Sequence, residues 1–521
     1  MNARRRRKTT SDASSLGRSR RTFLKTGFGL VGGAALGTSA SPLSAQSRPQ
    51  DAAAIRDRLE RRTRDPRGRI LIKGATIISM DPQVGDFAKA DLLVEGKKII
   101  DVKPDIKVSA EVLDATGTIM LPGFADTHRH AFGVFWTLEG LSQEPFTAQP
   151  SPIRRLAGAP APADGSARAR GLLNSQIQPD DIYAATLVTA LTCIKSGITC
   201  EMDWSGNSRT PEHADAAIQA LFDSGVRAVH GYGEPNSGSS RVPQDLARIQ
   251  KKFFSSSDQL VTLYLAMNIR SPENETIARI QFARDHGLRM TIDGADWPEQ
   301  GETIVRLGNA GHLGPDITFV HVNDIGDAAW KVLAGTGATV SLAAFSEPLI
   351  GIANGIPAVQ SAVNVGIRPS LSADVFQFSD FFTIMRMALC FQRQHAFESW
   401  YNGDRNPPRP VTMRDVLDFS TVQGVKANGL LDKCGTLTPG KEADLILIRA
   451  DDVNTVTLPN ALAAVVMAGD TSNVDTVMIG GKLKKFRGEL AAADEKRATR
   501  LYQQSRDKIF ARAGYKLDAL K

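Results

Sequence analysis

Apolar residues follow two alternating patterns along the middle of this 521-residue chain. Short apolar runs predict strands, and longer stretches with a period near 3.6 residues predict helices between them. The predicted strands are 119–126, 198–204, 226–231, 260–267, 288–293, 317–322, 338–343 and 367–373. The predicted helices include 181–195, 211–224, 272–286, 327–335 and 380–397. Eight strands alternating with helices predict an α/β fold, a (β/α)₈ TIM barrel, whose chemistry lies at the carboxyl ends of its strands.

Two strand-rich blocks bracket this middle region. They contain alternating apolar residues at 69–80, 91–102, 440–450 and 474–490. Gly96 lies at the position of a hairpin turn in the first block. We therefore predict a small β-sandwich domain built from both chain ends, residues 69–121 plus 434–490, beside a barrel of residues 122–433.

The remaining segments have weaker patterns. Residues 46–68 are polar and Arg-rich, which is typical of a linker, and 491–521 are predicted to form a C-terminal helix. The Pro/Ala-rich stretch 140–180 lacks clear periodicity. We predict that it forms a long loop after the first barrel strand, over the mouth of the barrel.

The positive charge is concentrated at the N-terminus. The formal net charge is +7, but residues 1–45 hold nine basic residues and one acidic residue, so the remainder is close to neutral. This distribution gives no reason to expect nucleic-acid binding. The four cysteines are too few and too scattered for a disulfide framework, and we interpret them as core residues, although Cys193 and Cys200 could also pair.

The N-terminal segment has the order of an export signal. Arg20-Arg21 precedes Phe23-Leu24-Lys25, an apolar run over 26–40 and small residues up to Ala45. It resembles the bacterial twin-arginine signal, which implies a periplasmic or secreted protein. A basic tail and an uncleaved anchor are the alternatives. The apolar run is shorter than the roughly 20 residues of a transmembrane helix, so we expect no stable membrane insertion.

The first predicted barrel strand ends in the motif PGFADTHRH, residues 122–130. Residues two apart on a strand point to the same side, so His128 and His130 can share one metal ion at the barrel mouth. Two unrelated surface histidines are the alternative. A second distinctive block, PGKEAD, occupies residues 439–444.

Together these motifs resemble the amidohydrolase superfamily, specifically its cytosine-deaminase and chlorohydrolase-like branch. The resemblance covers nearly all of residues 69–490. It implies a metal-dependent hydrolase that acts on carbon–nitrogen bonds other than peptide bonds, in amides, amidines, ureas or amino- or chloro-substituted heterocycles.

The resemblance also implies site residues at later strand ends. Asp374 follows strand eight, where the family's aspartate binds metal and takes a proton from water; a helix N-cap is the alternative. His321 follows strand six, where the family's histidine bonds the reacting oxygen; a core histidine is the alternative. At strand five the family usually has a histidine ligand, and Asp293 occupies that position here. The predicted catalytic residues are therefore Asp374 and His321, and the predicted metal ligands are His128, His130, Asp293 and Asp374.

Three further residues are predicted to bind substrate. His230 and Glu234 lie near the end of strand three, and Glu347 follows strand seven. For His230 a core position, and for Glu347 a solvated loop, are the alternatives. A second metal is not expected, because strands three and four offer no lysine.

The sequence thus predicts an enzyme with one divalent metal ion, for which zinc is the first choice and iron or manganese the alternatives. Its predicted partner is a small-molecule substrate, and we expect it to form a homo-oligomer. Two other functions stay open. The chain could be a heterocycle deaminase, or, because Asp293 replaces a histidine, a binding protein with a degenerate metal site.

Overall fold

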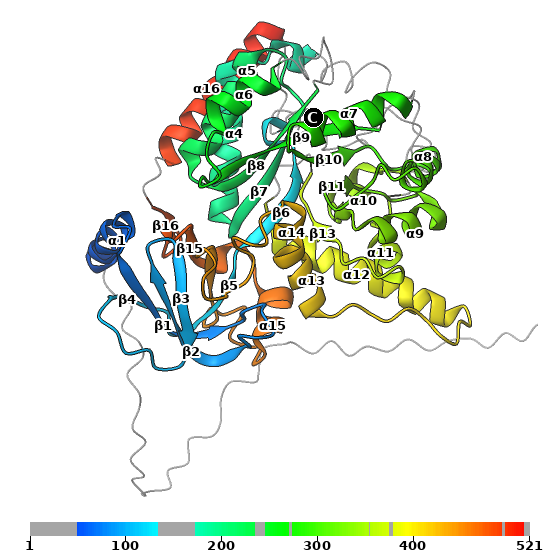
Figure 1. Ribbon diagram of the computed structural model, residues 1–521. Helices are drawn as coiled ribbons and strands as arrows, with labels where there is room; N and C mark the ends of the chain where they lie inside the picture. Colours follow the sequence, from blue (N-terminus) through cyan, green and yellow to red (C-terminus); the bar gives the residue numbers. More distant parts are fainter. Residues whose placement is uncertain are drawn as a thin grey trace, which may run out of the picture. The chain divides into compact units, whose positions relative to one another are not determined.

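The computed structural model describes residues 49–133, 172–234, 245–269, 273–353, 355–374, 379–491 and 495–514 (Figure 1). The predicted export signal and residues 140–171 of the predicted loop lie outside these residues. None of the helices in the described part of the chain combines the length and apolarity needed to cross a bilayer.

Eight parallel strands form the barrel predicted from the sequence. In chain order they are β6 (Phe124–Arg129), β7 (Ile198–Ser205), β8 (Arg227–Gly233), β9 (Val261–Asn268), β10 (Arg289–Asp293), β11 (Ile317–Val320), β12 (Thr339–Leu342) and β13 (Ser370–Leu371). Each strand pairs with the next, which gives the order β6 to β13 around the barrel. Because both faces of these strands are covered, they are continuous apolar runs and do not alternate between apolar and polar residues.

The seam between the first and last strands closes at the PGFADTHRH motif. Arg129 and Asp374 form a parallel bridge. The Asp374 backbone N–H donates to the His128 carbonyl oxygen at 2.9 Å, and the His130 N–H donates to the Asp374 carbonyl oxygen at 3.2 Å. Residues from the two ends of the barrel sequence therefore meet in the same short ladder.

Helices connect the barrel strands, as Figure 1 shows. They are α4 (Pro179–Lys195), α5 (Pro211–Ser224), α6 (Leu246–Phe253), α7 (Glu273–Asp285), α8 (Pro298–Asn309), α9 (Gly326–Thr336), α10 (Ser346–Ile350), α11 (Val359–Asn364), α12 (Phe381–Tyr401), α13 (Met413–Ser420) and α14 (Val422–Ala427). The five helices named from the sequence are present. The other six, α6, α8, α10, α11, α13 and α14, were not among the helices named from the sequence. Helix α8 begins with Pro298 at a position where proline suits a helix, and it buries Ile304 and Leu307.

A second sheet is built from both ends of the chain. Its strands are β1 (Arg69–Ile77), β2 (Phe87–Glu95), β3 (Lys98–Lys103), β4 (Glu111–Asp114), β5 (Thr118–Pro122), β14 (Leu445–Arg449), β15 (Val474–Ile479), β16 (Lys482–Phe486) and β17 (Glu489–Leu490). Antiparallel pairing of β5 with β14 joins the two halves. A separate sheet made from both ends is present, which is consistent with the predicted second domain. Its strands pair as one nine-stranded sheet, so the pairing does not itself define the two layers of the predicted sandwich.

The apolar run predicted as one strand at 119–126 is divided between the two sheets. Its first part belongs to β5, which ends at Pro122, and its second part belongs to β6, which begins at Phe124. Gly123 lies so close to the Thr199 side chain that a Cβ atom there would overlap it. The glycine therefore permits the close approach at which the chain passes from the small sheet into the barrel.

The predicted linker is wrong over most of its length. Helix α1 (Pro49–Arg64) occupies it, and its Leu59 is buried in the core of the small sheet. The helix has only a narrow apolar side, so the many arginines of this segment made its helical pattern difficult to recognise in the sequence. The remaining short helices are α15 (Ala461–Ala463), the π-helix Ala464–Ala468 and the 3₁₀ helix Thr471–Asn473.

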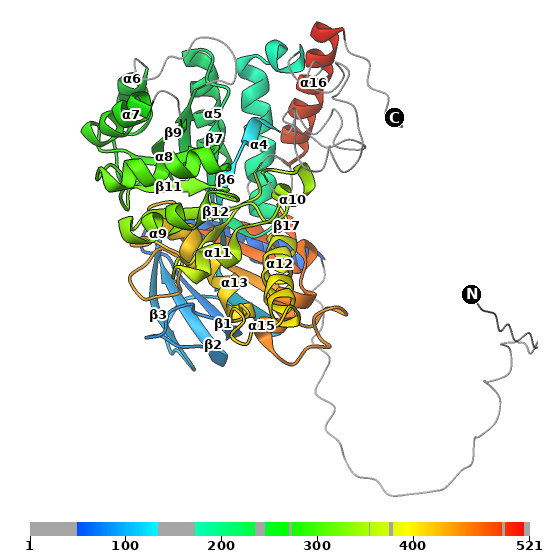
Figure 2. The same ribbon diagram turned by 90° about the vertical axis from the view of Figure 1, so that its right-hand side faces the viewer.

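The predicted C-terminal helix is present as α16 (Glu495–Ala513), and it lies along α4 (Figure 2). Ion pairs join the two helices near each end. Lys195 contacts Glu495 at 2.6 Å, and Arg512 contacts Asp181. The last described segment of the chain is thus fixed to the first helix of the barrel.

Candidate metal centre

His128 and His130 lie at the carboxyl end of β6, and their ring centroids are 4.8 Å apart. Both side chains are buried. The ring of Trp204, at the end of the neighbouring strand β7, lies 5.3 Å from the His130 ring. The Trp204 carbonyl oxygen lies 3.0 Å from His130 Nδ1 and accepts a hydrogen bond from it, which fixes the ring with Nε2 toward Asp293 and Asp374.

Two carboxylates from distant strands face these imidazoles. Asp374 Oδ1 lies 3.3 Å from His128 Nε2 and 3.7 Å from His130 Nε2. Asp293 Oδ2 lies 3.9 Å from each of the same two nitrogens. The structure therefore brings together the four residues that the sequence analysis predicted as metal ligands.

The local chemistry fits a divalent cation. Neither ring nitrogen of His128 makes a hydrogen bond to another described residue, although both are buried. Potential ligand atoms lie within 4.8 Å of one another in two overlapping groups, His128–His130–Asp293 and His128–His321–Asp374. A buried imidazole without a hydrogen bond is costly, and a metal bound there would satisfy it. Imidazole nitrogen and carboxylate oxygen are both ordinary ligands of zinc, iron and manganese.

His321 completes this cluster from the end of β11. Its Nε2 lies 3.6 Å from Asp293 Oδ1 and 3.9 Å from Asp374 Oδ2. Its Nδ1 lies 3.0 Å from Glu347 Oε1. Burial disfavours the imidazolium, but the Glu347 carboxylate and the neighbouring aspartates raise the pKa of His321 well above its ordinary value. The side chain can therefore donate a proton from Nε2 into the cluster.

Asp374 is held in an unusual conformation. Its φ is 64°, in the left-handed region, and the Ser346 hydroxyl donates to its Oδ2 at 2.9 Å. Although burial opposes ionisation, the imidazoles of His128 and His321 hold the pKa of Asp374 well below its ordinary value. The residues directly after it, 375–378, lie outside the described part of the chain.

Two residues of this region were missed by the sequence analysis. Asp296 follows Asp293 by three residues, and its buried Oδ1 has no hydrogen-bond partner among the residues that the structure describes. Burial, partly offset by His321, raises the pKa of Asp296 to about 7. Trp204 was missed as well, and within the same part of the chain its buried Nε1 has no partner either. The spacing of two acids in Asp293-Gly-Ala-Asp296, directly after a strand, was the available signal for Asp296.

The three predicted substrate-binding residues occupy different places. Side chains alternate along a strand, so His230 shares the helix-facing side of β8 with Ala228 and Tyr232, and its Nδ1 lies 3.2 Å from Asp203 Oδ2. The structure does not bring His230 to the metal cluster. Glu234 forms an ion pair with Arg279 at 2.5 Å.

Glu347 is fully buried, which corrects the alternative of a solvated loop acid. It lies behind His321, on the Nδ1 side of the ring, rather than among the ligands. A direct contact of Glu347, His230 or Glu234 with substrate stays a prediction.

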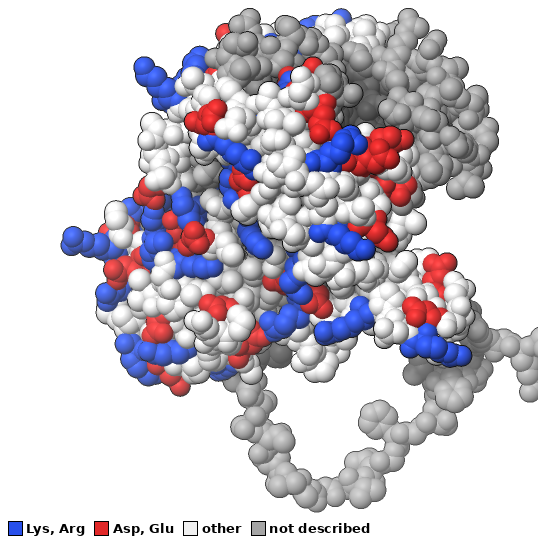
Figure 3. All heavy atoms as spheres, turned by 45° about the vertical axis from the view of Figure 1, so that its right-hand side comes forward, with Lys and Arg blue, Asp and Glu red and all other residues white. Residues whose placement is uncertain are grey.

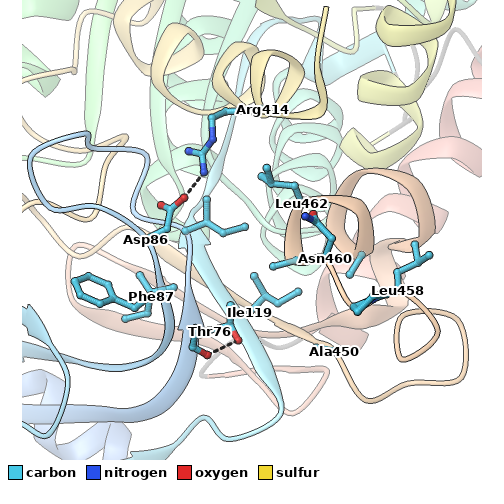
Figure 4. A pocket seen from close by; sticks show the side chains of 15 residues that line it. Thr76, Asp86, Phe87, Ile119, Arg414, Ala450, Leu458, Asn460 and Leu462 are labelled. Atoms are coloured by element: carbon cyan, nitrogen blue, oxygen red, sulfur yellow. Dashed lines mark hydrogen bonds and ion pairs between the residues drawn. The ribbon is translucent and has the colours of Figure 1, made fainter.

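A separate cavity of about 430 Å³ lies outside this cluster (Figure 4). Its walls come from the small sheet, from the segment 458–464 and from Arg414, which pairs with Asp86 at its edge. None of its lining residues belongs to the metal cluster.

An eight-stranded parallel barrel with candidate histidine and aspartate metal ligands at its strand ends is the arrangement typical of metal-dependent barrel hydrolases. The chain matches the amidohydrolase family over residues 119–484, which is most of its length. It therefore belongs to the amidohydrolase family, and it is a hydrolase of carbon–nitrogen bonds other than peptide bonds.

The similar proteins of known activity include deaminases. The chain is 24% identical over 462 residues to the 5'-deoxyadenosine deaminase of Methanosarcina mazei, a match that covers 85% of this chain and 99% of that protein. It is also 24% identical over 447 residues to the 5-methylthioadenosine/S-adenosylhomocysteine deaminase of Pelotomaculum thermopropionicum, covering 82% and 96% of the two chains.

Solved structures share the fold at low identity. An adenosine deaminase from Xanthomonas campestris with bound zinc matches with a TM-score of 0.70 and 18% identity, over 85% of this chain and 98% of that one. A mutant of atrazine chlorohydrolase from Arthrobacter aurescens TC1, complexed with zinc and atraton, matches with a TM-score of 0.69 and 20% identity, over 84% and 100%.

Proposed function

We propose that this protein is a metal-dependent hydrolase that removes an amino group from a small nitrogen heterocycle. The observation that carries the proposal is the convergence of His128, His130, Asp293 and Asp374 at one end of the barrel. The deaminases among its relatives support the substrate class, and the atrazine chlorohydrolase structure supports the fold alone. Amides, amidines, ureas and chloro-substituted heterocycles are the neighbouring substrate classes for the same site.

We further propose that these four residues hold one divalent metal ion. When bound, such an ion lowers the pKa of water from about 16 toward about 7 and so supplies hydroxide at neutral pH. With two carboxylates, this group of ligands carries more negative charge and more hard oxygen donors than a group with three histidines. Zinc is the first candidate because imidazole is among its usual ligands, and the added carboxylate favours iron or manganese more than a third histidine would.

The chain's own residues supply the proton transfers. Asp374 accepts a proton from the attacking water, since its carboxylate stays ionised beside the imidazoles. His321 donates from Nε2 to the ring nitrogen or oxygen that gains charge as the carbon is attacked. The C–N bond then breaks, and the amino group leaves as ammonia with the proton from Asp374. The added hydroxyl becomes the carbonyl of the product, and its proton restores the one that His321 gave to the ring. Asp296 is a second candidate donor, because its unpartnered oxygen is buried just after β10.

The test combines metal analysis with ammonia release. We expect His128→Ala to lose the metal and all turnover while the barrel stays folded, because it removes a ligand shared by both groups of donor atoms. The probes are 5'-deoxyadenosine, 5'-methylthioadenosine and aminotriazines. His395→Ala, on the exposed side of α12, is the matched control and should keep both properties.

An active variant without metal would contradict the mechanism. A wild-type chain that holds no metal after loading would favour the alternative of a binding protein with a degenerate site.

We also propose that the chain is exported by the twin-arginine route to the periplasm or beyond, and that it acts there as a homo-oligomer. The support for export is the order Arg20-Arg21, Phe23-Leu24-Lys25 and a following apolar run. On the face in Figure 3, basic and acidic side chains of the described residues are interspersed, which agrees with a small-molecule partner rather than a nucleic acid.

A further inference from the structure

The turn that carries His321 is strained. His321 has a φ of 68° and the next residue, Val322, a φ of 52°. The left-handed region is unfavourable for residues other than glycine, and a β-branched side chain makes it more so. Two such residues in succession persist only where their surroundings hold them in place. The structure must therefore contain groups that fix this turn.

Glu347 contacts both sides of the strained pair. His321 Nδ1 lies 3.0 Å from Glu347 Oε1, and the Asn323 amide nitrogen donates to Glu347 Oε2 at 3.2 Å. The backbone N–H of Ala343, just after β12, donates to Oε1 at 2.7 Å. The Glu347 carboxylate thus contacts His321 and Asn323, which flank Val322, and also the backbone at the end of β12.

These contacts also fix the proton of His321. The Ala343 and Asn323 nitrogens can only donate, so the fully buried Glu347 acts as an acceptor toward all its partners. His321 Nδ1 consequently carries the proton that it shares with Glu347. Its Nε2 is left facing Asp293 and Asp374 at 3.6 and 3.9 Å.

We propose that Glu347 is a positioning residue, which clamps the strained turn 321–323 and so aims Nε2 of His321 at the reacting atoms. This role differs from a direct contact with substrate. It rests on the proposed function only in that His321 is the group that acts. The adjacent residue Ser346 donates to Asp374, so the start of α10 holds two members of the cluster.

The first experiment replaces Glu347 by glutamine, which keeps the shape but turns one acceptor oxygen into an N–H donor that faces donors. We expect kcat to fall about 10- to 100-fold, as is usual when a partner behind a catalytic or ligand histidine is lost. The metal content should stay at the wild-type level, and KM should change less than kcat. Glu299→Gln, an exposed acid on α8, is the control and should change nothing.

A mutant cycle tests whether Glu347 acts through His321. In the His321→Ala background, Glu347→Gln should cause no further loss of kcat, because the group that it positions is absent. Losses that multiply would overturn the proposal, as would loss of metal from Glu347→Gln to the extent seen in His128→Ala.

A proton spectrum supplies a readout that needs no substrate. The buried Nδ1–H···carboxylate bond should give a proton resonance far downfield of the amides in the wild type. The resonance should disappear in His321→Ala and in Glu347→Gln. If Glu347→Gln keeps it, the proposal is wrong, whether or not ammonia is released. If the resonance is present in the wild type and lost in Glu347→Gln but no probe is deaminated, the proposed substrate class is wrong, while the positioning role of Glu347 is supported.

A second variant covers the case in which Glu347→Gln does not fold. Asn323→Ala removes one contact of the carboxylate but leaves Glu347 and His321 in place. We expect a folded, metal-containing protein with a smaller loss of kcat and a broadened downfield resonance. Wild-type kcat with an unchanged resonance in this variant would overturn the clamp.

Discussion

The central residue of the His128-Arg129-His130 motif contacts acidic side chains rather than the metal cluster. Arg129 is buried, and its Nε and Nη2 lie 2.8 and 2.7 Å from Asp126 Oδ2. Asp126 Oδ1 accepts from the backbone N–H groups of His128 and Ala373, at 3.3 and 3.2 Å. The Asp126 carboxylate therefore links the backbone of His128 to that of Ala373, the residue before Asp374. In this way a side chain outside the cluster helps to fix the positions of His128 and Asp374.

Glu201 lies at the edge of the same group, with Oε2 3.9 Å from Arg129 Nε and 3.1 Å from Cys193 Sγ. Burial is the main cause that raises the pKa of Glu201 to about 7. In the unfolded chain its pKa is near 4.5, so folding favours the protonated form. Its contribution to stability is present below pH 4.5 and is lost as the pH rises toward 7.

We therefore predict that Glu201→Gln becomes progressively more stable relative to the wild type between pH 4.5 and 7. The full change should not exceed about 3 kcal/mol of unfolding free energy. Urea unfolding of both proteins across this range measures it. The exposed Glu302→Gln should show no such trend, and a difference between Glu201→Gln and wild type that is constant with pH would refute the burial argument.

At the scale of elements, one buried ion-pair group joins the barrel to the second sheet. Arg227, the first residue of β8, donates to Asp444 at 2.6 and 2.9 Å and to Glu442 at 2.7 Å. Both acids belong to the PGKEAD block that the sequence analysis used to recognise the family. The block thus has a structural role, because its two acids hold the start of β14 against β8 of the barrel.

We predict that Arg227→Met lowers the free energy of unfolding by about 3–5 kcal/mol, because it removes the cation that pairs with the buried carboxylates of Asp444 and Glu442 and leaves Glu442, among the described residues, only its 3.4 Å contact with Lys97. Arg306→Met is the matched control. Its exposed pair with Glu273 should be worth less than about 1 kcal/mol. Equal effects of the two substitutions in urea unfolding would show that the Arg227 group does not hold the two sheets together.

Sequence patterns located the barrel strands well because each is a compact apolar run enclosed by turns. They did not single out α8, where Gly301 and Gly308 dilute the helical pattern, and they missed α1, which is rich in charged residues. His128 and His130 were predicted as ligands from the spacing of their motif, and Asp293 and Asp374 from the resemblance to the family; the structure brings the four together. The hold of Glu347 on His321 could not be predicted, because it joins residues 26 apart through a turn with positive φ.

At the scale of the whole molecule, a metal ion at the proposed site would couple binding to folding. The four proposed ligands come from the end of β6, from β10 and from Asp374, three residues after β13, so a bound ion would link three separate parts of the barrel. A ligand that binds only the folded state stabilises it by mass action, about 4 kcal/mol at 1,000 times its Kd. Loss of the ion should therefore weaken the barrel as a unit.

We predict that removing the metal with a chelator lowers the midpoint of thermal unfolding by several degrees, and that adding zinc or manganese back restores it. His128→Ala should unfold at one temperature regardless of added metal. Calorimetry of both proteins with and without metal measures this, and a wild-type midpoint that does not respond to metal would argue against a high-affinity site.

The seam between β6 and β13 also sets the order of biosynthetic events. Asp374 completes the ladder with His128 and His130, so a nascent chain shorter than 374 residues lacks the closing contact and one of the proposed ligands. The full set of proposed ligands therefore exists only after most of the polypeptide has been synthesised. On the proposal of twin-arginine export, which moves folded proteins, the chain would take up its metal in the cytoplasm and cross the membrane with the ion bound.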